Sequence, residues 1–459
     1  MHTRRGQPFL CLALCLLLAM TACSRNATPT PTATAVRMVP PASPTPASGT
    51  SPAPSPAAGV TPTADSSTAT PVPAPTADPV LLKKLTTIEE RTSQIRGLSA
   101  SAAKEKRVVT REQLKAVLKQ EEGTDSAKLK TSEALLRFLG LLSPTDDLEA
   151  LENDLLNQQV LGLFDPDSGE LYVVSDSASF SILDEFTYAH EYTHSLQQGS
   201  FDIAKVEKGM RGNSEASSAY TALVEGDAVV TQVLYAQKYL DLRELARQER
   251  ASGGGSSTVY PKFLTDSLVF PYTTGVAFVQ YLHERGGYDA VNKAFQSPPV
   301  STSQIMHPDK YTAGNAPQAV TLPDIPAKLG SGWTKLDEDQ FGEFDLRLYL
   351  ELHAAPANAG RAADGWHGDR FAFLKGPNEQ LLVVALFQWE STKDAQEFFS
   401  THSAGMTQQA PGVQTGATKA AGLVGGQYQY VSVHGTGTLL VLASQASAME
   451  PVVALFPGY

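Results

Sequence analysis

A long stretch near the start of the chain restricts where any folded part can begin. Between residues 26 and 79 the sequence is dominated by Pro, Thr, Ala and Ser, with very few large apolar side chains. Such a composition cannot bury enough surface to offset the entropy of the chain, so we expect a disordered, extended linker over residues 23–79. The linker either holds a folded head away from a surface or is a plain spacer. Both interpretations place the folded part of this 459-residue chain after residue 80.

Residues 1–22 have the organisation of a secretory signal peptide. A basic start is followed by an apolar run from Phe9 to Met20, well short of the roughly 20 residues that cross a bilayer. The sequence "MTAC" then resembles the lipobox of bacterial lipoproteins, which implies that Cys23 carries a lipid and anchors the chain to the membrane. Met20 stands where leucine is more usual, so ordinary cleavage and an uncleaved anchor stay open. We expect the protein in the cell envelope or outside the cell.

The net charge argues against nucleic acid as a partner, and the cysteine content argues against disulfide bonds. Without residues 1–22 the formal charge changes from −12 to −14, because that segment holds two arginines and no acidic residue. An acidic chain of this kind is not expected to bind nucleic acid. Cys11 and Cys15 lie within the signal, so Cys23 is the one cysteine left in the mature chain, and no disulfide can form within it.

The periodicity of apolar residues predicts an α+β protein with two folded domains. Leucines recur at helical spacing between residues 80 and 150, and "QVLGLFDPDSGELYVVSD" then reads as two short strands joined by a turn. The next helix carries Ser181 and Asp184 in capping-box spacing and Gly199 as its stop. From residue 329, strand-like runs surround one helix. We therefore expect a mainly helical domain with a short hairpin over residues 80–328 and a smaller α+β domain over residues 329–459.

The sequence "HEYTH" on the predicted helix indicates a metal centre. His190 and His194 project from the same face of a helix and can bind one ion, while Glu191 lies beside that face. This is the metalloprotease pattern, with zinc activating a water and Glu191 as the general base. A chance match is expected about once in a hundred chains of this composition. Two histidines without a metal are the alternative.

The identity of the third ligand separates classes of zinc protease. A metzincin would have glycine and histidine where this chain has Gln197 and Ser200, so that class is excluded. Glu225, in "AYTALVEGDAVV", is the better candidate, although it could be a solvated acidic residue, as we expect for Glu215. Small neighbours would let the Glu225 helix approach the first one closely; these are Ala222, Gly226 and Ala228.

With a glutamate as third ligand the chain resembles the gluzincins, which include thermolysin-like proteases and zinc aminopeptidases. Thermolysin-like enzymes have an aspartate four positions after the glutamate, which orients a histidine. This chain has Val229 there, and the nearby acid is Asp227. The residues that support the ligands must therefore differ. Over residues 150–315 the chain resembles an uncharacterised family of bacterial secreted HExxH-type peptidases, which implies a zincin-like fold and a peptide or protein substrate. The segments that carry this resemblance are "AHEYTHSLQQGSFDI", "ALVEGDA", "YTTGVAFVQYLHERGGYDAVNKAF" and "STSQIMHPDKY".

Zinc peptidases use a Tyr or His to stabilise the developing oxyanion. Tyr272 in "FPYTTG" and His307 in "MHPDKY" are the candidates, because both follow the metal helices in polar, turn-rich segments. A structural role is the alternative for each. Among the other histidines after the signal segment, His283 is expected to be an ordinary helix residue. The four in the C-terminal part lack ligand spacing; they are His353, His367, His402 and His434.

These observations predict a zinc-dependent peptidase that acts outside the cytoplasmic membrane. We also expect "LYVVSD", or the strand before it, to pair with an extended substrate backbone. The alternative is a non-catalytic envelope lipoprotein that uses a peptidase-derived fold to bind a partner. A structural zinc is disfavoured, because such sites are closed by four ligands rich in cysteine. Whether the helices of residues 80–150 inhibit the site is left open.

Overall fold

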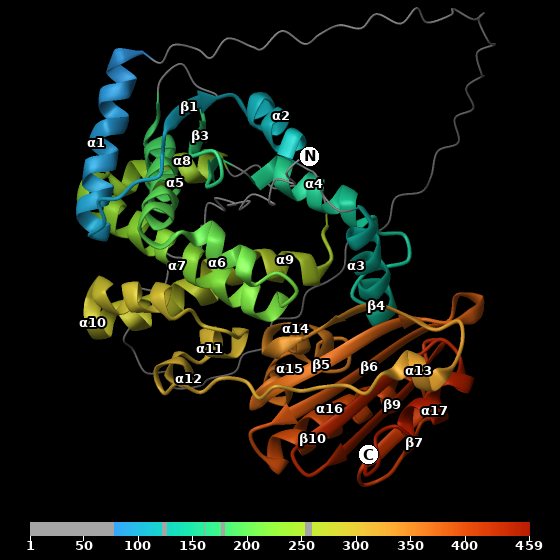
Figure 1. The fold of residues 1–459 in the computed structure, drawn as a ribbon. Coiled ribbons are helices and arrows are strands. Elements are labelled where there is room, and N and C mark those ends of the chain that lie inside the picture. The colour runs from blue at the N-terminus through green and yellow to red at the C-terminus, as the bar shows by residue number, and fades with distance from the viewer. Residues whose placement is uncertain (1–77, 122–125, 160, 176–179, 253–258) are drawn as a thin grey trace, which may run out of the picture. The chain divides into compact units, whose positions relative to one another are not determined.

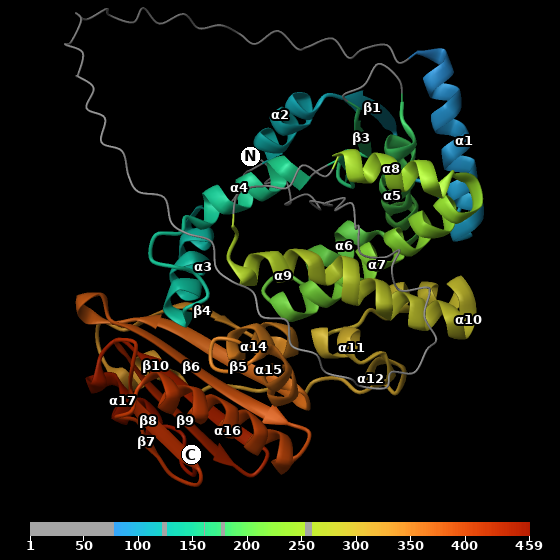
Figure 2. The ribbon, with the colours of Figure 1, turned by 180° about the vertical axis from the view of Figure 1, so that it is seen from behind.

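The computed structural model describes residues 78–121, 126–159, 161–175, 180–252 and 259–459. The predicted signal peptide, the lipidation site Cys23 and nearly all of the predicted linker lie outside the described residues. Within the described ranges, no helix is both long and apolar enough to cross a membrane. Figures 1 and 2 show the arrangement of helices and strands from two sides.

Residues 79–329 are mostly helical, as the periodicity predicts. The helices are α1 (Pro79–Arg96), α2 (Arg111–Glu121), α3 (Ser126–Leu139), α4 (Leu148–Gln159), α5 (Ile182–Phe201), α6 (Ile203–Gly209), α7 (Ser214–Tyr239), α8 (Leu242–Ser252), α9 (Lys262–Phe270), the π-helical turn η1 (Pro271–Gly275), α10 (Val276–Gln296), α11 (Thr302–Met306), α12 (Pro308–Thr312) and α13 (Ile325–Leu329).

A three-stranded sheet accompanies these helices, built from β1 (Glu105–Val109), β2 (Gly162–Asp165) and β3 (Glu170–Val174). β2 and β3 form the predicted antiparallel hairpin, but β3 also pairs in parallel with β1, so the strand order is β1–β3–β2. The idea that "LYVVSD" pairs with a substrate is therefore wrong, because this segment contains β3 and both of its edges are occupied. Of the two hairpin strands, β2 is at the edge.

Helix α5 begins as predicted and ends later than predicted. The Ser181 side chain accepts from the Asp184 N–H, and the Asp184 side chain accepts from the Ser181 N–H, which confirms the capping box. The expected stop at Gly199 is wrong, because α5 continues to Phe201 and is capped by Asp202 in the left-handed conformation. Gly199 instead allows close packing: a Cβ there would lie 2.2 Å from the backbone oxygen of Ala100.

The small residues around Glu225 let a different element approach than the sequence suggested. A Cβ on Gly226 of α7 would lie 2.4 Å from the backbone oxygen of Gly275 in η1, and a Cβ on Gly275 would lie 2.2 Å from the backbone oxygen of Ala222. Gly226 and Ala222 therefore lie directly against η1, an element that the sequence had not suggested as their neighbour. Helix α7 also packs along α5, which brings Glu225 toward the two histidines.

The C-terminal region is a seven-stranded antiparallel sheet with helices on both faces, which confirms the α+β class. The strand order is β4–β5–β6–β10–β9–β8–β7. Its elements are β4 (Thr334–Asp339), α14 (Gly342–Leu350), α15 (Pro356–Ala363), β5 (Trp366–Lys375), the 3-10 turn η2 (Pro377–Glu379), β6 (Leu381–Trp389), α16 (Thr392–Gln409), β7 (Gln414–Thr415), β8 (Lys419–Val424), β9 (Gln427–His434), β10 (Gly437–Ala443), the 3-10 turn η3 (Ala446–Ala448) and α17 (Met449–Val453).

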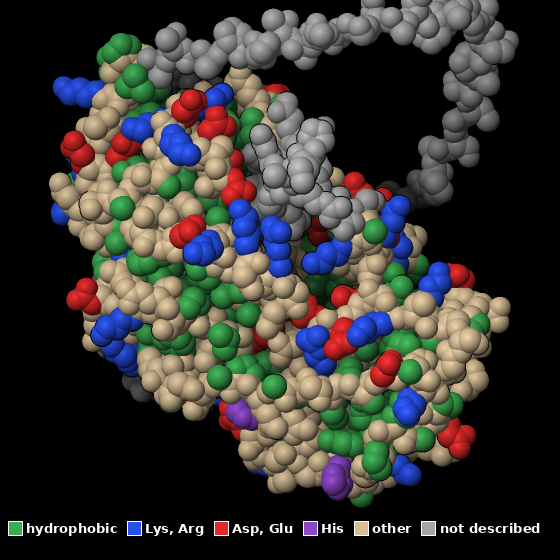
Figure 3. All heavy atoms as spheres, viewed as in Figure 1, with side chains coloured by type: hydrophobic (Ala, Val, Ile, Leu, Met, Phe, Trp, Pro, Cys, Tyr) green, Lys and Arg blue, Asp and Glu red, His purple; other side chains and the backbone are tan. Residues whose placement is uncertain are grey.

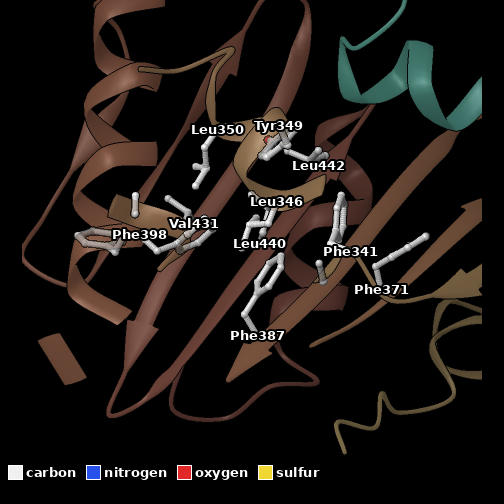
Figure 4. Close-up of a cluster of buried hydrophobic side chains, with 14 of the residues drawn as sticks. Phe341, Leu346, Tyr349, Leu350, Phe371, Phe387, Phe398, Val431, Leu440 and Leu442 are labelled. Carbon is white, nitrogen blue, oxygen red and sulfur yellow. The ribbon is translucent and has the colours of Figure 1, made fainter. Parts of the chain in front are cut away.

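The central strands of this sheet are apolar on both faces. In β10, Leu440 and Leu442 join a core with α14, α15 and α16, whereas Leu439 and Val441 join a second core with α13 and α17. Successive strand residues point to opposite faces, so a continuous apolar run is expected where both faces are covered. Figure 4 shows the first of these cores. Helix α3 contributes to it from far upstream, through Leu135 and Leu139.

One acidic residue is buried against expectation. Acidic and basic side chains are interspersed over the surface in Figure 3, but Glu215 is only 3% exposed. Its Oε1 accepts hydrogen bonds from the backbone N–H of Thr302 at 2.6 Å and from the Thr302 hydroxyl at 2.9 Å. Burial raises the pKa of Glu215 well above its ordinary value. The expectation of a solvated side chain is wrong, because Glu215 joins α7 to α11.

Candidate metal centre

The structure brings together the three residues predicted as metal ligands. His190 and His194 lie one turn apart on α5, and Glu225 reaches them from α7. The Nε2 atoms of the two histidines are 3.1 Å apart. Glu225 Oε2 lies 3.3 Å from His190 Nε2 and 3.5 Å from His194 Nε2. All three side chains are buried.

These three atoms have the spacing of ligands around one small cation. A tetrahedral zinc ion with ligand bonds of about 2.0–2.1 Å holds its ligand atoms about 3.3 Å apart. The observed separations of 3.1, 3.3 and 3.5 Å fit this value. Buried Glu225 Oε2 accepts no hydrogen bond of good geometry from the described residues, as expected of an atom that binds a metal. Two imidazoles and one carboxylate also form a donor set that suits zinc.

The electrostatics keep the Glu225 carboxylate ionised. Burial alone would raise the pKa of Glu225, but the two histidines outweigh it and lower the pKa to about 2. In the same way burial opposes protonation of His194, yet Glu225 raises its pKa to about 9. For His190, burial is the larger effect and lowers the pKa. Without a metal ion Glu225 and His194 thus favour each other's charged forms, and a bound cation would take the place of the proton on His194 Nε2.

Glu191 lies beside the cluster with its carboxylate uncommitted. The side chain is completely buried, and neither oxygen accepts a hydrogen bond of good geometry from the described residues. Burial raises its pKa to about 8; the nearby backbone N–H of Phe164 acts in the opposite direction. Strand β2 runs close over this side chain, because a Cβ on Gly162 would lie 2.6 Å from Glu191 Cγ. Any larger residue at 162 would displace the carboxylate.

Tyr272 lies near the cluster. It is 4% exposed in η1, and its ring centroid is 6.4 Å from that of His190. The sequence placed it in a polar turn, but the segment is a π-helical turn packed against α7. Such turns are often found at functional sites.

His307 is not part of the ligand group. It precedes α12, and its Nε2 lies 2.6 Å from Glu343 Oε1 of α14 and 3.7 Å from Asp364. The Glu343 hydrogen bond raises the pKa of His307. Lys310 Nζ lies 4.0 Å from the other oxygen of Glu343, so a cation is already near this carboxylate. The contacts of His307 connect α12 to the C-terminal region and do not link it to the cluster.

Three residues that support the ligands were not assigned this role from the sequence. Gln197 Oε1 lies 2.8 Å from His194 Nδ1, and Gln197 Nε2 donates to Asp227, which pairs with Arg96. Gln197 lies one turn after His194, and this spacing is the one signal that could have identified it. Arg96 is 131 residues from Asp227, and no local pattern connects them.

Comparison with known proteins identifies similarity over the C-terminal region. Residues 331–452 match a family described as a domain of unknown function (DUF8575). No curated protein matches the chain. A solved structure titled "Crystal structure of a putative hydrolase with a novel fold from Chloroflexus aurantiacus" aligns with a TM-score of 0.36 and 16% identity, over 52% of this chain and 92% of that chain. A TM-score this low does not establish a shared fold. The C-terminal region is thus similar to a family without a described function.

Proposed function

We propose that this protein is a zinc-dependent peptidase of the gluzincin type. The observation that carries the proposal is the buried cluster of His190, His194 and Glu225, with the uncommitted carboxylate of Glu191 beside it. Three protein donors leave a fourth position for water, which is the arrangement of catalytic zinc sites. The sequence resemblance to HExxH peptidases agrees with this donor set.

A bound zinc ion would supply Lewis acidity, lowering the pKa of a water and polarising the substrate carbonyl. The charge of a bound cation would keep Glu191 ionised, and its carboxylate would then accept the proton of the attacking water and pass it to the leaving nitrogen. Both oxygens are available for this, because no described residue holds either of them in a good hydrogen bond. We assign the donation to the developing oxyanion to Tyr272, because its ring lies beside that of His190.

Strand β2 is the proposed docking edge for an extended substrate. The Val174 N–H donates to the Leu161 oxygen, so the alternation of an antiparallel pair turns the backbone groups of Gly162 and Phe164 away from β3. Glu191 lies over the face of β2 at Gly162, and the Phe164 N–H acts on its carboxylate. A peptide paired with β2 would therefore pass the general base.

The proposed location is outside the cytoplasmic membrane, on a lipid at Cys23 and a linker over residues 23–79. This part of the proposal rests on the sequence, because nearly all of those residues lie outside the described part of the chain. Mass spectrometry of the N-terminal peptide from membrane fractions tests it. A diacylated Cys23 is the expected result, and an unmodified mature N-terminus at another residue contradicts the anchor.

The experiment that tests the activity uses Glu191→Gln beside Glu185→Gln, a control on the same helix whose carboxylate contacts Tyr235. Both variants and the parent are assayed for zinc content and for cleavage of a random-sequence peptide library by mass spectrometry. We expect about one zinc per chain in all three, with cleavage lost only in Glu191→Gln. Cleavage retained in that variant removes Glu191 from the mechanism, and a parent that binds no zinc contradicts the metal centre.

A further inference from the structure

A chain of buried hydrogen bonds runs from helix α1 to the metal cluster. Arg96, in the last turn of α1, donates through Nε to Asp227 Oδ2 at 2.9 Å. The same oxygen of Asp227, on α7, accepts from Gln197 Nε2 at 2.8 Å. Gln197 Oε1 then lies 2.8 Å from His194 Nδ1. The four side chains are each essentially inaccessible to solvent.

The environment of Gln197 determines which way its amide points. Its Nε2 faces two acceptors, the Val224 backbone oxygen at 2.9 Å and Asp227 Oδ2 at 2.8 Å. Neither of these atoms can donate, so the nitrogen of the amide must face them. The amide oxygen is therefore the atom that faces His194.

This orientation determines the tautomer of His194. A glutamine oxygen can only accept, so His194 must carry a proton on Nδ1. When Nδ1 is protonated in the neutral ring, Nε2 carries the lone pair. The Nε2 atom is also the one that points to His190 Nε2 and Glu225 Oε2. The hydrogen-bond chain thus orients the His194 ring and leaves the Nε2 lone pair free to bind the metal.

Arg96 holds Asp227 in place and offsets its charge. The ion pair is completely buried, with Arg96 Nε 2.8 Å from Asp227 Oδ1. The guanidinium carbon of Arg96 lies 4.5 Å from the ring centroid of Tyr288, in cation–π contact. A planar guanidinium suits a site that combines a carboxylate with an aromatic face, and a lysine does not offer the same geometry.

We propose that Gln197 is a positioning residue for the metal centre, and that Asp227 and Arg96 fix the orientation of the Gln197 amide. Helix α1 is then an integral support of the site, not a removable inhibitory segment. This inference rests on the proposed function, since it assigns a support to one of the proposed zinc ligands. It goes beyond that function in extending the metal centre to a helix almost 100 residues before the first ligand.

Gln197→Met in the full chain is the direct test, because methionine has nearly the same shape and cannot accept the His194 proton. Gln198→Met is the matched control, one residue further along the same helix, where the amide contacts Asp202 and the Ala204 N–H. Zinc affinity is measured by competition with a chromophoric chelator. We expect a loss of about 10–100-fold for Gln197→Met and no change for the control, since second-shell partners of metal-bound histidines have effects of this size.

A second readout separates positioning from a general loss of stability. Cobalt replaces zinc, and the visible ligand-field spectrum reports the geometry of the bound ion. We expect an altered spectrum in Gln197→Met and an unaltered one in Gln198→Met. A variant with lower thermal stability but the zinc affinity and cobalt spectrum of the parent would overturn the inference.

Arg96→Lys tests the far end of the chain and remains informative if Gln197→Met does not fold. It keeps the positive charge but loses the Nε donor to Asp227 and the planar group that stacks on Tyr288, so we expect zinc affinity to fall in the same direction by a smaller factor. Parent-like affinity in this variant would remove α1 from the metal centre. A parent protein that binds no zinc would overturn the proposed function as well, whereas a zinc-binding parent with insensitive variants would overturn only this inference.

Discussion

Tyr272 is the site residue whose role can be tested by removing a single atom. Its ring lies beside His190 in a buried π-helical turn. If its hydroxyl donates to the oxyanion, Tyr272→Phe should lower kcat by about 10²–10³-fold and leave KM and zinc content nearly unchanged. Tyr220→Phe is the control, because this buried tyrosine packs against Phe295 and belongs to a hydrophobic core. Steady-state kinetics on one cleaved peptide gives the comparison, and equal kcat values in both variants would exclude Tyr272 as the donor.

At the residue scale, local spacing predicted more than distant contacts did. The four-residue interval placed His190 and His194 on one helix face, and the structure brings Glu225 to them. His307 was proposed from its polar segment alone, and its partner Glu343 belongs to a part of the chain that no local pattern links to it. Gln197 served only to exclude one protease class, because the sequence does not show what faces its amide.

At the element scale, the edge of β2 predicts which backbone amides a bound substrate will protect from hydrogen exchange. An extended, non-cleavable peptide analogue should slow amide hydrogen exchange in Gly162 and Phe164, whose backbone groups face away from β3. New hydrogen bonds protect exactly those amides that the strand pairing leaves open. Exchange measured by mass spectrometry over residues 161–175 tests this. Binding without any change in that range would rule out β2 as the docking edge.

Elements whose turn or cap residues are close in sequence were predicted well. Elements that depend on contacts with distant parts of the chain were not. The hairpin and the capping box of α5 follow from turn and cap residues that are close in sequence. Strand β1 escaped notice because it is short and charged, and it is a strand only through its pairing with β3, more than 60 residues later. Gly199 was misread as a helix stop for the same reason, since its function is to contact Ala100.

At the scale of the whole molecule, buried acids make stability depend on pH. Asp369 is fully buried, and burial raises its pKa from 3.8 to about 6, although Phe341, Gly342 and Trp366 donate hydrogen bonds to it. The folded state binds this proton more tightly, so the stabilisation is complete below pH 4 and is lost as pH rises to about 6. The contribution is about 3 kcal/mol.

Asp369→Asn removes this titration. Urea unfolding at pH 4 and pH 7 should show the stability of the parent falling relative to that of the variant as pH rises. The variant is expected to be less stable at pH 4, because an amide cannot accept all three hydrogen bonds. A difference between the two proteins that does not change with pH would contradict a raised pKa for Asp369.

Helix α3 is synthesised long before the C-terminal elements against which it packs. Leu135 and Leu139 belong to the core formed with α14, α15 and α16, and Gln427 of β9 donates to the Phe138 backbone oxygen. A ribosome completes α3 about 200 residues before it begins to supply this core. During that interval Leu135 and Leu139 lack their native partners in this core. The proposed secretion of this chain would therefore favour a route that keeps it unfolded until its last strand has been made.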